Sequence, residues 1–102
     1  MRIISTKRLD EFARLHARAR SSLEKWEDVV VSVDWASFAD LRRTFGNADT
    51  VRVASGRNAV VFNIAGNSFR LVCAIHYNIR TVFVLRFMSH AEYSKDTWKN
   101  DL

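Results

Sequence analysis

Three side chains that can transfer protons or stabilise charge lie close together near the end of the chain. His90, Tyr93 and Lys95 fall within six residues, directly after an apolar run that predicts a strand. An imidazole, a phenol and an ammonium group can take, give or stabilise protons and charge around a phosphodiester. The preceding segment 50–91 holds five arginines and no Asp or Glu. An acid–base cluster after a basic, acid-free segment favours a protein that handles RNA or DNA.

Length and charge narrow the class of protein further. The chain has 102 residues, is 48% hydrophobic and carries a formal net charge of +5. This length predicts one domain over residues 1–102, with enough apolar side chains for a modest core. A basic domain of this size favours a polyanionic partner, with nucleic acid first. The alternative is a basic protein that binds nothing specific.

Cysteine and histidine usage argues against several kinds of site. The single cysteine, Cys73, excludes an internal disulfide and a cysteine-based zinc site, and its apolar neighbours predict a buried, inert thiol. The three histidines lack metal-ligand spacing, so we expect no metal and no cofactor. The first five residues are too few for a signal-peptide core, and no apolar stretch is long enough to span a bilayer. We therefore expect a cytoplasmic protein without a membrane partner.

The elements that position these groups begin with helices in the first half of the chain. Residues 2–5 predict a short strand, and Thr6 is the expected N-cap of a helix that runs to about residue 20. Residues 21–24 fit a capping box that opens a second helix, and Ser37 fits the start of a short third one. Basic side chains of the first helix are expected to form a solvated surface: Lys7, Arg8, Arg14 and Arg18.

From Thr50 onward the apolar period is two, which is typical of strands. One strand is predicted from Val51, and others over residues 60–64, 69–76 and 81–88. Gly66-Asn67 is expected to form a tight hairpin turn, because both residues tolerate positive φ. The sequence predicts an α+β fold: a short N-terminal strand and two to three helices packed on an antiparallel meander, followed by a short C-terminal helix.

Strand alternation predicts which side chains share a face of this sheet. Arg70 and His76 should share one face of their strand. On the last strand a common face is expected for Val82, Val84, Arg86 and Met88, opposite Phe83, Leu85 and Phe87. If the Phe/Leu/Ile face packs against the helices, the face that carries Arg70 and Arg86 is open to a ligand.

The end of the last strand predicts where chemistry would occur. Ser89 to Glu92 match a capping box, which places His90 in the first turn of a helix, where the helix dipole favours a neutral imidazole. Such a ring can accept a proton from a ribose 2′-OH. Together with Tyr93, Lys95 and Arg70 it would supply the proton transfer and cationic groups of metal-free RNA cleavage, since an arginine fork suits phosphate. The alternative is a purely structural role as cap and core edge.

Two motifs in this order resemble the HigB family of bacterial type II toxin–antitoxin systems. They are V-F-N-I-A-G-N-S-F-R-L-V at residues 61–72 and F-M-S-H-A-E-Y at residues 87–93. The family patterns are approximately F-N-I-x-G-N-x-x-R-L-[IV] and F-x-x-T-H-x-E-Y-D-K, and the earlier tryptophans and helices extend the resemblance over nearly the whole chain. This sequence departs from the pattern at Ser89, where the family has Thr, and at Ser94, where it has Asp.

The resemblance implies a RelE-like toxin that cleaves mRNA, typically on the translating ribosome. It also implies a cognate HigA-type antitoxin, a helix-turn-helix protein that neutralises the toxin. Its catalytic and basic positions fall on Arg70, His90, Tyr93 and Lys95. The further residues that we expect to contact RNA are Arg57, Asn67, His76 and Arg86.

Two other functions remain open from the sequence. Related toxins of the same superfamily inhibit DNA gyrase without an acid–base cluster, and a chain of this kind would bind rather than cut. A general basic RNA-binding module would show affinity that falls steeply with salt but would have no dedicated antitoxin. The cluster of His90, Tyr93 and Lys95 favours a nuclease over both.

Overall fold

A five-stranded sheet in the order β1-β5-β4-β3-β2 carries the structure, a computed structural model that describes residues 1–102. Its strands are β1 (Arg2–Ile4), β2 (Asp49–Arg52), β3 (Asn58–Ile64), β4 (Phe69–His76) and β5 (Thr81–Ser89). Neighbours from β2 to β5 pair antiparallel, which confirms the predicted meander. The short first strand joins the far edge and pairs parallel with β5.

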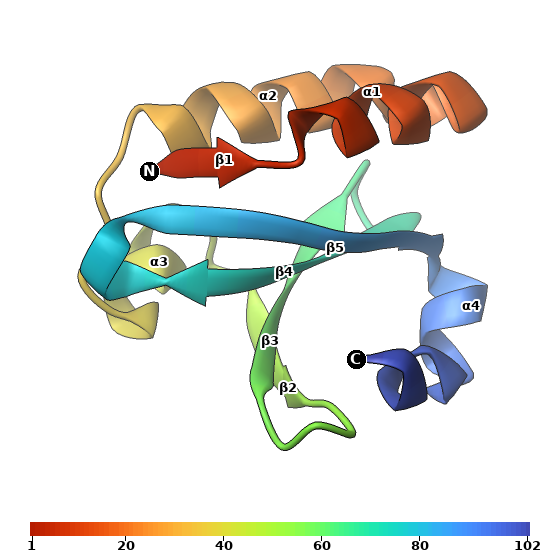
Figure 1. Cartoon of the computed structure of the whole chain (residues 1–102). Helices are drawn as coiled ribbons and strands as arrows, with labels where there is room; N and C mark the ends of the chain where they lie inside the picture. Colours follow the sequence, from red (N-terminus) through yellow and green to blue (C-terminus); the bar gives the residue numbers. More distant parts are fainter.

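Four α-helices complete the α+β fold. They are α1 (Thr6–Leu15), α2 (Arg20–Val31), α3 (Phe38–Thr44) and α4 (His90–Ser94), and a last 3-10 turn covers Thr97–Asp101. In Figure 1, α1 and α2 lie side by side along one side of the sheet, whereas α4 and the C-terminal turn follow the C-terminal end of β5 and lie away from these two helices. No helix combines the length and the apolar character that crossing a membrane requires.

The starts of the first two helices differ from expectation. The helix from Thr6 ends at Leu15 instead of near residue 20, and Ser5 takes the N-cap position. A 3-10 turn at Ala17–Ala19 then leads directly into α2. The residue before α2, Ala19, already has right-handed helical angles, so Ser21 lies inside the helix and the capping box expected there is wrong. Ser37 does cap α3, accepting a hydrogen bond from the amide of Asp40.

The main core lies between the helices and the sheet and is dominated by aromatic rings. Phe62 of β3 is only 1% exposed and makes edge contacts with Trp26 and Phe45 at centroid distances of 5.3 and 5.1 Å. Trp35 stacks near Phe62 and donates its indole N–H to Thr44 Oγ1 at 3.0 Å. Trp35 is thereby tied to α3, which contains Thr44.

A β-bulge in β5 changes the side chains that share a face. Val72 pairs with Arg86 but Cys73 pairs with Val84, so Leu85 is an extra residue on β5. Val84 consequently packs in the main core with Cys73, whereas Arg86 lies on the opposite face with Met88. The expectation that Val82, Val84, Arg86 and Met88 share one face is wrong, because strict alternation fails at an inserted residue.

The face expected to be open is partly covered by a second, smaller core. Trp98, in the C-terminal turn, packs there with Met88 and Val72, and the other members are Val53, Ala59 and Val61. The turn is anchored by the amide of Ala54, which donates to the carbonyl of Lys99 at 3.0 Å. Only the parts of this face beside α4 and beyond the C-terminal turn remain available to a ligand.

The β3–β4 turn reverses the chain, but the residues with positive φ differ from those predicted. Ala65 and Gly66 have φ of 54° and 66°, and Asn67 does not fall in this region. The turn closes with a hydrogen bond from the Ser68 amide to the Ala65 carbonyl at 3.3 Å. Asn67 is thereby left with its carbonyl and side chain available to bind Arg70.

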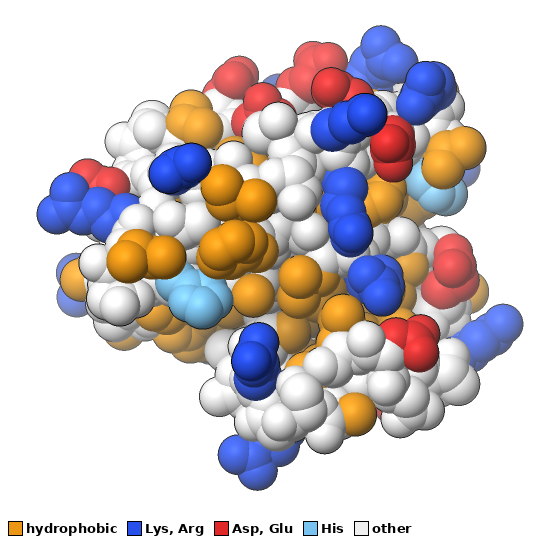
Figure 2. Space-filling model, viewed as in Figure 1, with side chains coloured by type: hydrophobic (Ala, Val, Ile, Leu, Met, Phe, Trp, Pro, Cys, Tyr) orange, Lys and Arg blue, Asp and Glu red, His pale blue; other side chains and the backbone are white.

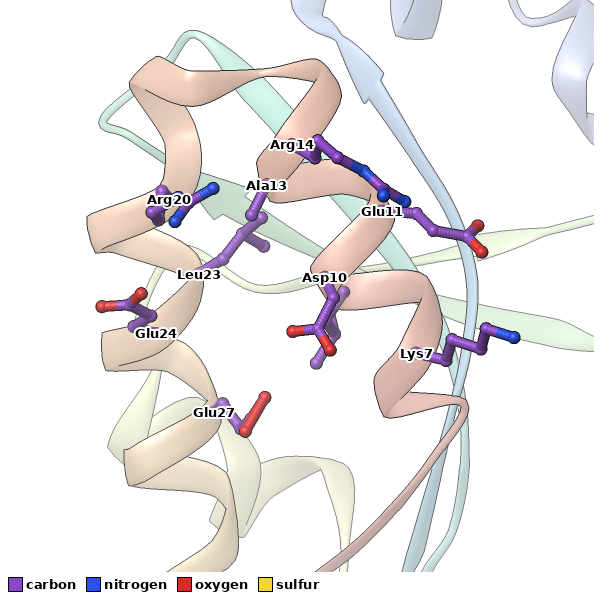
Figure 3. Close-up of a pocket in the computed structure, with 10 residues that line it drawn as sticks. Lys7, Asp10, Glu11, Ala13, Arg14, Arg20, Leu23, Glu24 and Glu27 are labelled. Atoms are coloured by element: carbon purple, nitrogen blue, oxygen red, sulfur yellow. The ribbon is translucent and has the colours of Figure 1, made fainter.

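Acidic side chains gather in a groove between α1 and α2. Figure 3 shows Asp10 of α1 facing Glu24 and Glu27 of α2 across this groove. Partial burial, followed by repulsion from Asp10, Asp28 and Glu24, raises the pKa of Glu27 above its usual 4.5. Protonation of Glu27 therefore favours the folded state, and the stability that it contributes is lost as the pH rises through the raised pKa.

Replacing Glu27 with Gln should stabilise the domain at neutral pH. A glutamine cannot ionise, so the repulsion from the neighbouring carboxylates is removed. Removing one like-charge pair from a helix surface raises the free energy of unfolding by about 0.2–0.5 kcal/mol. Thermal melts between pH 4 and pH 7 should show that the parent loses stability relative to Glu27→Gln as the pH rises. The Glu11→Gln change removes the same charge from an exposed side chain of α1 that points away from Glu24 and Glu27 in Figure 3, and it serves as the control. Equal melting temperatures for Glu27→Gln and parent at pH 7 would contradict the repulsion.

Candidate active site

Arg70 lies at the centre of the candidate site, on β4 next to the β3–β4 turn. The side chain is buried, with the residue 7% exposed, and no carboxylate forms an ion pair with it. Its Nη1 donates to the carbonyls of Asn67 and Phe69 at 3.2 and 3.1 Å. Its Nη2 donates to Asn67 Oδ1 at 2.7 Å and meets His90 Nδ1 at 3.1 Å. A positive charge is thus held by neutral acceptors, and it remains unneutralised.

His90 is placed by the cap at the start of α4. Ser89 Oγ accepts from the Glu92 amide while the Glu92 carboxylate accepts from the Ser89 amide, which confirms the predicted capping box. The His90 amide donates to the carbonyl of Ser68 at 3.0 Å and ties α4 to the β3–β4 turn. Since a guanidinium can only donate, the contact with Arg70 makes Nδ1 an acceptor, and a neutral His90 ring carries its proton on Nε2.

The ring of Tyr93 has Arg70 and Trp98 as neighbours. Trp98 stacks on its ring at 5.4 Å and 24°, and the Arg70 guanidinium lies over the ring at 5.5 Å. The stacked indole therefore covers one face of the Tyr93 ring. The hydroxyl makes no hydrogen bond within the chain. Burial raises the pKa of Tyr93, and the carboxylates of Asp49 and Asp96 raise it further. The cations Lys99 and Arg70 lower it but do not cancel this rise, so the phenol stays protonated at neutral pH.

The remaining candidates lie in two other places. Arg86 and Lys95 line a shallow hollow beside α4 that also includes Trp98. Arg57 and His76 line a second hollow, between the β2–β3 turn and the far end of β4. The structure therefore brings Arg70, Asn67, His90 and Tyr93 together, whereas Lys95 and Arg86 lie in the hollow beside α4 and Arg57 and His76 lie apart from the cluster.

One basic residue that sequence reasoning treated as solvated surface reaches the sheet. Arg8 of α1 donates from Nη1 to the carbonyl of Leu85 at 2.8 Å, across 77 residues of sequence. The place of Arg8 in the helical pattern of α1 did not indicate this contact. The bulge that exposes the Leu85 carbonyl depends on the pairing of two strands, and only the fold shows it.

Other reactive groups do not join this site. Cys73 is buried as predicted, and burial raises the pKa of its thiol far above the ordinary value. No three His, Cys, Asp or Glu side chains lie close enough together to hold a metal ion. The arrangement offers a buried guanidinium, an imidazole with a defined acceptor nitrogen and a protonated phenol.

A comparison with protein-family models gives a match over most of the chain. The family model HigB_toxin, described as the RelE-like toxic component of a toxin–antitoxin system, matches residues 19–96. The matched span runs from the end of the 3-10 turn before α2 to the residue after α4's C-cap, and includes Arg70, His90 and Tyr93. No curated protein matches the sequence.

Proposed function

Because this chain belongs to the HigB family of RelE-like toxins, we propose that it is a metal-independent endoribonuclease that cleaves mRNA on the translating ribosome. As the toxic component of a toxin–antitoxin system it has an antitoxin partner, and we propose a helix-turn-helix antitoxin of the HigA type. The site of action would be the cytoplasm. The observation that supports cleavage most strongly is the 3.1 Å contact between Arg70 and His90 beside the protonated phenol of Tyr93.

Metal-free cleavage of RNA requires two proton transfers. The 2′-oxygen forms a bond to phosphorus while the bond to the 5′-oxygen breaks, so one proton must leave the 2′-OH and another must reach the 5′-oxygen. His90 Nδ1 is the basic nitrogen of the resting ring and is occupied by Arg70 Nη2. When Nη2 turns to the substrate phosphate, Nδ1 is freed to take the 2′-OH proton at the place where the phosphate binds.

Tyr93 is suited to the second transfer. Its raised pKa keeps the proton on the phenol, and the stacked Trp98 holds the ring in position. It would donate to the departing 5′-oxygen. Arg70 would stabilise the charge that builds on the phosphorane, and the exposed Lys95 would add positive charge nearby. Arg86, Arg57 and His76 would contact the RNA on either side.

The proposal is tested by mapping mRNA 5′ ends in cells that express the chain from a tightly controlled promoter. The parent should arrest growth and produce new 5′ ends within translated regions. His90→Ala removes the base and should lower cleavage by at least about 10²-fold. Ala91→Ser, an exposed change in the same helix, should cleave like the parent.

Two outcomes would contradict the proposal. If His90→Ala produces the same ends at the same rate, His90 has no catalytic role. If mRNA stays intact during growth arrest while purified protein inhibits DNA gyrase, the chain acts as a non-catalytic toxin. If the chain causes no growth arrest and binds RNA with an affinity that falls steeply with salt, it is a general basic RNA-binding module instead.

A further inference from the structure

The open edge of β5 beside α1 carries an unusual arrangement of cations. β1 pairs only with Thr81–Phe83, so the part of β5 from Val84 onward has no neighbouring strand on that side. The bulge places the Leu85 carbonyl at this edge. Two arginines reach it: Arg8 Nη1 from α1 and Arg86 Nη1 from β5 itself, each at 2.8 Å.

The two guanidinium groups share this one acceptor without any carboxylate to separate them. Neither Arg8 nor Arg86 forms an ion pair. Like charges at such close range repel, and the edge of the protein screens them less well than bulk water. Each guanidinium has five N–H donors and spends one of them on Leu85, so most of the donors remain free. An anion between them would remove the repulsion and accept these hydrogen bonds.

The arginine pair lies next to the candidate active site along the same strand. Arg70 pairs across the sheet with Met88, and Arg86 precedes Met88 by two residues on the same face. At about 3.3 Å per residue this separation is about 6.6 Å along the strand. In Figure 2, Lys and Arg side chains form a row from the helical layer down across β5. A chain of phosphates could follow this row away from Arg70.

We infer that Arg8 and Arg86 form a second phosphate-binding site, which holds a phosphate of the RNA strand near to, but distinct from, the one that is cleaved. The inference rests on the proposed function, because it assigns part of the path of the same substrate. Arg86 reaches the Leu85 carbonyl from the face of the sheet that carries Arg70, and Arg8 reaches the same carbonyl from α1. Planar guanidinium forks bind phosphate oxygens in pairs, which a lysine at either position would not reproduce.

Binding of an RNA oligonucleotide with 2′-O-methyl riboses tests this site, because the blocked 2′-oxygen cannot attack and the RNA stays intact. Fluorescence anisotropy at several salt concentrations gives the slope of log K against log salt. Losing one phosphate contact lowers the steepness of this slope by about 0.7 for single strands. Arg8→Gln should show that loss and bind more weakly, most clearly at low salt.

Arg14→Gln is the matched control, since Arg14 is exposed on the same helix and lines the α1–α2 groove instead of the sheet edge. It should keep the slope of the parent. If Arg8→Gln and Arg14→Gln give the same slope, the second site does not exist. A lower melting temperature for Arg8→Gln with an unchanged slope would likewise overturn it, and would leave Arg8 as a cap for the bulge alone.

Failure of this inference is distinguishable from failure of the proposed function. If the parent cleaves mRNA while Arg8→Gln keeps the parent's slope, only the second phosphate site is wrong. If the parent shows no salt-dependent binding to the RNA and no cleavage, the proposed function fails and the site fails with it. In both cases a melting temperature of Arg8→Gln equal to that of Arg14→Gln shows that the variant is folded.

Discussion

Asn67→Asp should abolish most of the RNA cleavage while leaving the fold intact. Asn67 Oδ1 already accepts from Arg70 Nη2 at 2.7 Å, so a carboxylate of the same shape fits the site and forms an ion pair there. The pair neutralises the positive charge that the buried Arg70 otherwise presents to the phosphate. Loss of one preorganised charge-stabilising group typically costs about 10²–10³ in rate.

The measurement is the rate of mRNA cleavage by purified protein on translating ribosomes, together with the melting temperature. Asn47→Asp supplies the same change in net charge at an exposed position in the loop before β2, and should cleave like the parent. The melting temperature of Asn67→Asp should equal or exceed that of the parent, because no group is left unpaired. If both Asp variants cleave equally well, the charge of Arg70 takes no part in the reaction.

Phe62→Ala should have the largest effect on stability. The ring is 1% exposed and contacts Trp26 of α2 and Phe45 at the end of α3, so it joins both helices to β3. Truncating a buried phenylalanine to alanine costs about 3–5 kcal/mol, partly through the cavity that remains. The whole domain is expected to be stable by only about 5–15 kcal/mol.

Urea unfolding followed by tryptophan fluorescence measures this loss. The midpoint should fall with little change in the denaturant slope, since the surface exposed on unfolding stays similar. Phe62→Leu keeps most of the side-chain volume and should lose much less stability. A midpoint for Phe62→Ala equal to that of the parent would mean that the aromatic cluster is loosely packed. In cells the alanine variant would lose toxicity through lower abundance, which the melting temperature separates from a defect in the site.

The cap and the charge pattern make the active-site region partly predictable from sequence. Ser89 and Glu92 form a capping box through contacts within four residues, and such local chemistry does not depend on the rest of the fold. It therefore places His90 at the start of α4 correctly. The absence of acids from residue 50 to 91 is equally visible in sequence, and it explains why Arg70 has no carboxylate partner on its own strands.

The immediate neighbours of Arg70 come from contacts that sequence patterns do not encode. Besides the Phe69 carbonyl of its own strand, its acceptors lie on the β3–β4 turn, where Ala65 has positive φ, and on α4. Trp98 covers the face that alternation predicted to be open, because the C-terminal turn folds back onto β4 and β5. Trp98 also stacks on the half-buried ring of Tyr93, whose raised pKa keeps the phenol protonated at neutral pH.

The sequence by itself determined the α+β class, the meander, the cap of α4, the basic character and the HigB family, since period, local hydrogen bonding and motif order are properties of neighbouring residues. Only the tertiary structure decided the bulge at Leu85, the burial of Arg70 and the meeting of Arg8 with Arg86. Each of these features depends on how the strands pair and on which other elements pack against the sheet. Both are decided by contacts between residues that lie far apart in the chain, and a local sequence pattern does not contain such contacts.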